Sequence, residues 1–221
     1  MLNILFPKRC CGCEKALASH ERLLCVSCRH QIPLLCHDHL SELLIKKKFY
    51  GRLQLQHAIS LMRFQKQGLT QKLLHHMKYY GVKELSAFFG NWLGNEMDAL
   101  NNTWNVDMVI PVPLDRKRLK KRGYNQVAGF GKRMAAALDA EYRDNILLKT
   151  ANIRSQVRKN RFLRFESGAV FTVNNVDELN DKHVLLVDDI ITTGATIEKC
   201  AAELFKGKHV KLSVASIAIT G

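Results

Sequence analysis

Residues 184–196 read Val-Leu-Leu-Val-Asp-Asp-Ile-Ile-Thr-Thr-Gly-Ala-Thr, and this stretch decides how the second half of the chain is interpreted. The apolar run over 184–187 suits a strand that is buried on both faces. Such a strand delivers Asp188 and Asp189 to its carboxyl end, the edge at which open α/β sheets bind their ligands. We therefore expect a ligand site that begins at Asp188.

The sequence after the two aspartates predicts a turn into a helix. Apolar residues recur from Ile197 to Phe205 with the i, i+3, i+4 spacing of a helix that buries one face. A glycine that allows close backbone approach, threonine hydroxyls and free helix N–H groups at a positive dipole end favour phosphate binding. The two carboxylates can accept hydrogen bonds from ribose hydroxyls. The alternative is an ordinary buried strand with an acidic turn and a threonine cap.

These features predict a site for a phosphorylated ribose. Its candidate substrate-binding residues are Asp188, Asp189, Ile190, Thr192, Thr193, Gly194, Ala195 and Thr196. Asp188 and Asp189 are also the candidate catalytic residues.

The chain after residue 58 alternates predicted strands with predicted helices. Strands are expected over 58–64, 106–113, 146–148, 169–173, 183–187 and 210–219, and helices over 69–79, 83–100, 125–138 and 193–205. This alternation predicts an α/β fold with a parallel sheet flanked by helices. The polar, basic segment 149–168 has no assigned element and is interpreted as a functional loop.

Six of the seven cysteines precede residue 37, and four of them form two Cys-x-x-Cys pairs. In a chain taken to be cytosolic this pattern indicates metal binding. The predicted ligands of a structural zinc site are Cys10, Cys13, Cys25 and Cys28. The stretch between the pairs is shorter than in the commonest zinc ribbons, so the alternative ligands are Cys11, Cys36, His37 and His39. A metal would supply the stability that residues 1–40 cannot obtain from burial alone.

Length and charge limit the classes of partner. A chain of 221 residues can bury one ordinary core and carry one small extra module. Its formal charge of +14 favours polyanionic partners, either nucleic acid or polyphosphorylated small molecules. No apolar run approaches the roughly 20 residues of a membrane span, and the first residues are too short for a signal-peptide core. We therefore expect a cytoplasmic protein without a membrane span.

The stretch 184–196 resembles the phosphoribosyl pyrophosphate (PRPP) motif of type I phosphoribosyltransferases. More of the chain resembles one branch of them, the ComF family, also called GntX or competence protein F. The similarity lies in the two Cys-x-x-Cys pairs, in Lys78-Tyr79-Tyr80-Gly81, in Ile110-Pro111-Val112-Pro113-Leu114 and in Arg122-Gly123-Tyr124-Asn125-Gln126. The resemblance implies a type I phosphoribosyltransferase fold over 46–221 and a small four-cysteine zinc module with its linker over 1–45.

The resemblance also implies a pyrophosphate site next to the ribose. The candidates on this side are Val112, Pro113, Arg118, Arg122, Asn125, Gln126 and Arg161. The run 116–122 holds six cations in seven residues, and a solvated basic turn is the alternative interpretation of it. Cations of the 149–168 loop can close over a pyrophosphate or grip a nucleic-acid backbone, and the sequence does not separate these options.

Two functional hypotheses follow. The first is an enzyme that transfers ribosyl phosphate from PRPP, with Mg2+ bridging pyrophosphate and ribose oxygens, to an unknown acceptor, and that takes part in DNA uptake or utilisation. Catalysis would then be mainly electrostatic and positional. The second is a non-enzymatic, zinc-bearing adaptor that binds single-stranded DNA for the DNA-uptake proteins. The intact phosphate motif favours the first, whereas the metal module favours the second.

Overall fold

The computed structural model describes residues 7–35, 38–99, 104–150 and 170–221. Its centre is a five-stranded sheet in the order β1-β7-β6-β2-β3, and every pair of neighbours runs parallel. The strands are β1 (Ala58–Arg63), β2 (Met108–Pro111), β3 (Glu141–Tyr142), β6 (His183–Ile191) and β7 (Lys211–Ile219). The predicted parallel α/β sheet is therefore confirmed.

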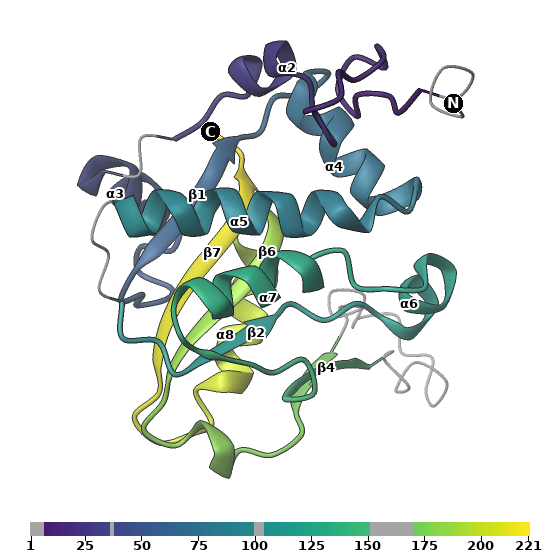
Figure 1. Ribbon diagram of the computed structural model, residues 1–221. Helices are drawn as coiled ribbons and strands as arrows, with labels where there is room; N and C mark the ends of the chain where they lie inside the picture. Colours follow the sequence, from purple (N-terminus) through teal and green to yellow (C-terminus); the bar gives the residue numbers. More distant parts are fainter. Residues whose placement is uncertain (1–6, 36–37, 100–103, 151–169) are drawn as a thin grey trace, which may run out of the picture.

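Helices cover both faces of this sheet (Figure 1). One face carries α5 (Lys83–Ala99) and α7 (Ala128–Ala137), and the other carries α8 (Ala195–Leu204). Successive residues of β6 pack alternately against these two helical layers. Leu185 and Val187 belong to the buried cluster of α5 and α7, whereas Leu186 belongs to that of α8. The apolar run of β6 is thus buried on both faces, as its composition predicts.

Two of the expected strands do not join the parallel sheet. β4 (Leu147–Thr150) and β5 (Val170–Val173) form a separate antiparallel pair. No helix is assigned between them in the sequence, and an antiparallel pair needs no helical crossover, whereas a parallel pair does. The short helix η2 (Asp177–Leu179) then leads to β6.

Two further expectations need correction, one on the end of β6 and one on the basic segment 116–122. The strand expected to end at residue 187 continues to Ile191, because β7 continues to pair with it up to Ile219. The basic run 116–122, interpreted as a loop or turn, is the helix α6 (Arg116–Arg122). Asp115 caps the start of α6 by accepting a hydrogen bond from the backbone N–H of Arg118 at 2.9 Å.

The N-terminal part contains α2 (Val26–Gln31) and α3 (His39–Lys47) and packs directly against the sheet and α4 (Leu69–Tyr79). Residues 33–35 run along the outer edge of β1, where Leu35 N–H donates to the Leu61 carbonyl at 3.1 Å and Arg63 N–H donates to the Pro33 carbonyl at 2.9 Å. The boundary proposed after residue 45 falls inside α3 and stays a prediction. Among the described residues, no helix is both long and apolar enough to cross a membrane.

Candidate functional site

The turn between β6 and α8 has several features that suit an anion. Thr192, Thr193 and Thr196 are exposed there, and Thr193 Oγ1 accepts a hydrogen bond from Ala195 N–H at 3.4 Å. Gly194 precedes the first residue of α8 with φ of +86°, a left-handed conformation that side chains rarely adopt. The first N–H groups of α8 therefore begin beside three hydroxyls, an arrangement suited to an anion.

A second element holds this glycine in place. A Cβ atom on Gly194 would lie 2.6 Å from the ring of Phe49, which is fully buried in the cluster beneath α8. Phe49 follows α3, so the N-terminal part of the chain forms one wall of the candidate phosphate loop. Only a residue without a side chain fits between this ring and the start of α8.

Asp189 is the buried end of a polar chain. Its side chain is 6% exposed, and Oδ2 receives both Lys78 Nζ at 2.8 Å and Gln126 Nε2 at 2.9 Å. Gln126 Oε1 in turn accepts a hydrogen bond from Arg122 Nη1 at 2.8 Å. Buried carboxylates require partners of this kind, because their desolvation is otherwise very unfavourable. The chain links Asp189 to a cation at the end of α6.

The segment between α6 and α7 is fixed by its neighbours. Asn125 Nδ2 donates to the Val112 carbonyl at 3.0 Å, and Asn125 Oδ1 accepts from Val127 N–H at 3.2 Å. The Tyr124 hydroxyl donates to the Met77 carbonyl at the end of α4. These contacts place Gln126 beside Asp189, directly before α7 begins.

Asp188 lies in a different environment, because successive residues of a strand point to opposite faces. Burial and the adjacent charge of Asp189 raise the pKa of Asp188 to about 8, although the Asp189 N–H donor, Lys78 and Lys149 act in the opposite direction. The protonated form of Asp188 can donate a hydrogen bond as well as accept one. A ribose hydroxyl can be its partner.

The structure brings together some of the predicted pyrophosphate residues and not others. Arg122, Gln126 and Asp189 form one hydrogen-bonded chain, and Asn125 binds the backbone of Val112. Pro113 follows Val112 at the end of β2. Arg118 is directed elsewhere: its side chain is 63% exposed and pairs with Asp115 at 3.3 Å. Arg161 lies outside the described residues.

Sequence reasoning missed the role of Lys78. It appeared only as part of a family-like motif, although the helical period offered a stronger signal. Lys78 follows the buried Leu74 by four residues on α4, and it therefore lies on the face that turns toward the sheet. A cation on the apolar face of an amphipathic helix indicates a buried anionic partner, which here is Asp189.

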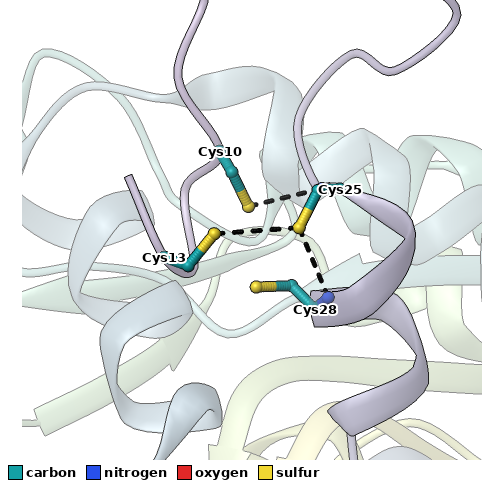
Figure 2. A group of neighbouring side chains, drawn as sticks. All are labelled: Cys10, Cys13, Cys25 and Cys28. Atoms are coloured by element: carbon teal, nitrogen blue, oxygen red, sulfur yellow. Dashed lines mark hydrogen bonds between the residues drawn. The ribbon is translucent and has the colours of Figure 1, made fainter. Parts of the chain in front are cut away.

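The two Cys-x-x-Cys pairs converge at the other end of the chain (Figure 2). The sulfur atoms of Cys10, Cys13, Cys25 and Cys28 all lie within 4.8 Å of one another. Cys13 Sγ and Cys25 Sγ are 3.7 Å apart. A tetrahedral zinc site with Zn–S bonds of about 2.3 Å has sulfur–sulfur edges of roughly 3.8 Å. The cluster thus has the chemistry and the size of a four-thiolate metal site.

Backbone donors surround these sulfurs. Cys10 Sγ accepts hydrogen bonds from Cys25 N–H at 3.3 Å and from Gly12 N–H at 3.4 Å. Burial alone would raise the pKa of Cys10, but the backbone N–H donors outweigh it and lower the pKa to about 7. Such donors favour the thiolate form that metals bind.

The alternative zinc ligands considered from the sequence are Cys11, Cys36, His37 and His39. Cys11 is buried but does not belong to the group of neighbouring sulfurs, and His39 is exposed at the start of α3. Cys36 and His37 lie outside the described residues. Within the described part of the chain, the four cysteines of the two pairs are therefore the set that can hold a metal.

Comparison with known proteins agrees with this architecture. The sequence model of the phosphoribosyl transferase domain family matches residues 128–220. The competence protein ComFC of Streptococcus pneumoniae is 32% identical over 122 residues, which are 55% of this chain and 50% of ComFC. The competence protein F of Haemophilus influenzae is 24% identical over 93% of this chain and 87% of its own length.

Other relatives extend the comparison. The DNA utilization protein YhgH of Escherichia coli O157:H7 is 24% identical over 64% of this chain and 63% of its own length. A purine phosphoribosyltransferase from Pyrococcus horikoshii is 19% identical over 62% of this chain and 72% of its own, with a TM-score of 0.35. The fold assignment rests on the sheet order and on the matched domain rather than on this overlap. The matched domain, the parallel sheet, the four-cysteine cluster and the competence-protein relatives are together consistent with the ComF family and with a type I phosphoribosyltransferase fold.

Proposed function

We propose that this protein binds PRPP, or a related phosphorylated ribose, at the carboxyl end of β6 and transfers ribosyl phosphate to an acceptor not yet identified. The observation that carries the proposal is the left-handed Gly194 between the acidic strand and the start of α8. It lets the chain turn so that α8 begins next to three exposed threonines, a combination of helix N–H groups and hydroxyls that suits a phosphate. The names of the relatives support a role in DNA uptake or utilisation.

Each part of the site would then have its own task. Thr192, Thr193 and Thr196 would hold the 5-phosphate with the first N–H groups of α8. Asp189 would accept a hydrogen bond from one ribose hydroxyl, and the neutral Asp188 would donate one to another. When bound with PRPP, Mg2+ supplies positive charge to the pyrophosphate. Departure of pyrophosphate from C1 of the ribose would be favoured by electrostatics and positioning.

Calorimetry with ribose 5-phosphate, and with PRPP and Mg2+, tests this proposal. We expect wild-type binding and a loss of about tenfold or more in affinity in the Asp188→Asn, Asp189→Asn double variant. Circular dichroism confirms that the variant is folded. Unchanged affinity in a folded double variant would exclude the site, and a pyrophosphate-release screen against bases, ammonia and DNA then tests catalysis separately.

Single-stranded DNA binding is the second candidate, and a surface beside the ribose site favours it. α6 exposes five of its six cations, and the neighbouring Tyr79 and Tyr80 are 59% and 67% exposed. Arg122 at the end of α6 lies over the Tyr79 ring, with Cζ 5.3 Å from its centroid. Cations next to exposed aromatic rings are typical of surfaces that bind single strands.

Salt dependence distinguishes this candidate. The variants Arg116→Gln, Lys117→Gln, Lys120→Gln and Lys121→Gln, combined in one protein, should flatten the log-log salt slope by roughly 0.7 for each DNA phosphate that the protein no longer neutralises. Arg118 and Arg122 stay unchanged there, so that ribose 5-phosphate affinity serves as the control. If wild-type protein shows no salt-dependent binding to single strands, the adaptor function has no physical basis.

We infer that the four-cysteine cluster holds a structural zinc ion. Four thiolate ligands support this identity, since soft sulfur ligands favour zinc and leave no open position for hydrolytic chemistry. The division into a zinc module over 1–45 and a phosphoribosyltransferase-like domain over 46–221 belongs to the same proposal. Metal analysis of the purified protein tests the zinc assignment.

A further inference from the structure

We propose that Lys78 is a positioning residue of the ribose site: together with Gln126 it holds one oxygen of Asp189, so that the other oxygen is presented to the ligand. This inference rests on the proposed binding of a phosphorylated ribose. It assigns to α4 a part of the site that lies far from the PRPP motif in sequence.

The geometry at Asp189 distinguishes its two oxygens. Lys78 Nζ and Gln126 Nε2 both meet Oδ2, at 2.8 and 2.9 Å. Among the described residues, no donor forms a hydrogen bond with Oδ1. Two donors on one oxygen fix the rotation of the carboxylate and leave its second oxygen as the acceptor for a hydroxyl. Asp189 thus has the orientation of a binding group before any ligand arrives.

Lys78 is not a freely moving surface cation. Met77, the residue before it, is fully buried, and its carbonyl accepts the hydrogen bond from the Tyr124 hydroxyl. Tyr79, the residue after it, lies beneath Arg122. The Lys78 side chain itself is only 23% exposed. The end of α4 is therefore held in place on both sides of Lys78. This places the Lys78 ammonium group next to Asp189 before a ligand binds.

Lys78 lies outside the part of the chain that matches the phosphoribosyl transferase domain. The matched phosphoribosyl transferase domain covers residues 128–220 and contains Asp189. Lys78 and Gln126, the two residues that fix Asp189, both precede it. The segment N-terminal to the matched domain thus completes the proposed ribose site.

Ribose 5-phosphate binding, measured by calorimetry on the full chain at pH 7, tests the inference. Lys78→Met should weaken binding by about tenfold or more, because Asp189 loses one of the two donors that fix its orientation. Lys78→Arg should restore most of the affinity. The matched control is Lys72→Met, which removes an exposed lysine of the same helix and should bind like the wild type.

A double-variant cycle separates positioning from general structural damage. In an Asp189→Asn background, Lys78→Met should change the affinity little, because the carboxylate that it orients is gone. Lys78→Gln keeps a hydrogen-bond donor without the charge and replaces Lys78→Met if that variant does not fold.

The outcomes are distinct. Equal affinity for the wild type and the neutral Lys78 variants, with weakened binding by Asp189→Asn, would overturn the inference and leave the proposed function intact. Failure of the wild type to bind either ribose 5-phosphate or PRPP with Mg2+ would overturn the proposed function, and the role of Lys78 with it.

Discussion

Asp188 and Asp189 are neighbours in sequence, yet the fold gives them different surroundings. Asp189 has Lys78 and Gln126 as partners, whereas burial and the charge of Asp189 raise the pKa of Asp188. A carboxyl group with a strongly raised pKa is typical of functional sites. The stability of the free protein should therefore depend on the proton of Asp188.

We expect Asp188→Asn to stabilise the ligand-free protein at alkaline pH. Folding raises the pKa of Asp188 from 3.8 to about 8, so its contribution to stability is complete below pH 3.8 and is lost as pH rises through 8. An amide does not titrate. Urea unfolding should show a gain of about 1–2 kcal/mol at pH 8.5 and a smaller gain at pH 5. A gain that is the same at both pH values would show that Asp188 is not protonated in the folded chain.

Gly194→Ala should destabilise the protein and weaken ribose 5-phosphate binding. The left-handed backbone alone costs about 1–3 kcal/mol with a side chain, and the new methyl group would also collide with Phe49. Gly81→Ala is the matched control, since its φ is +72° and nothing lies within 4 Å of the position of its Cβ. Equal losses in urea unfolding for the two variants would mean that contact with Phe49 is unimportant.

At the scale of elements, the position of the site depends on how closely α5 and α7 approach each other. A Cβ atom on Gly90 of α5 would lie 2.7 Å from the Phe130 carbonyl oxygen in α7. Gln126 lies two residues before α7, so a displacement of α7 away from α5 should also disturb the hydrogen bond between Gln126 and Asp189.

Gly90→Ala should therefore push α7 away and reduce stability by about 1–3 kcal/mol, as overpacked cores do. Ribose 5-phosphate affinity should fall as well, because Gln126 moves with the helix. Asn91→Ala, on the exposed face of α5, is the control and should change neither quantity. If urea unfolding and calorimetry give wild-type values for Gly90→Ala, the two helices have room to adjust.

The sequence predicts these elements well where a simple period decides them. The bounds of α4 follow from its amphipathic pattern, and β1, β7 and α8 were predicted to within a few residues. The extension of β6 to Ile191 was not predictable, because it depends on pairing with a distant strand. α6 carries almost no apolar residues, so its helical state depends on its Asp115 cap and could not be read from periodicity.

The candidate site could be predicted in part. The proposed phosphate loop follows from a local motif, and the grouping of the four cysteines follows from their spacing. The partners of Asp189 could not be assigned from local sequence, because Lys78 meets it only through the packing of α4 against the sheet. Long-range contacts of this kind leave no trace in composition or spacing.

At the scale of the whole molecule, the cysteine cluster and the sheet share one buried core. Cys10, Cys28 and Ile32 pack in the same cluster as α4 and α5. Phe49, which follows α3, also lies against the proposed phosphate loop. Loss of a metal from the proposed zinc site should consequently destabilise the sheet and its helices as well.

We expect about one zinc ion per chain and a single unfolding transition in which chelation lowers the melting temperature by about 10 °C or more. The double variant Cys10→Ser, Cys25→Ser should lose the metal and melt at the lowered temperature. Cys11→Ala, which leaves the four ligands unchanged, should retain it. Two separate transitions, with the main one insensitive to chelation, would instead indicate independent domains.

The contact of residues 33–35 with β1 bears on how the chain is made. β1 emerges from the ribosome long before β7, its partner in the sheet. The inner edge of β1 therefore stays unpaired until nearly all of the remaining chain has been synthesised. An apolar strand with open edges invites pairing with other nascent chains. Residues 33–35 are synthesised before β1 and can cover its outer edge at once. The N-terminal part thereby limits the growing polypeptide to one unprotected edge at this strand.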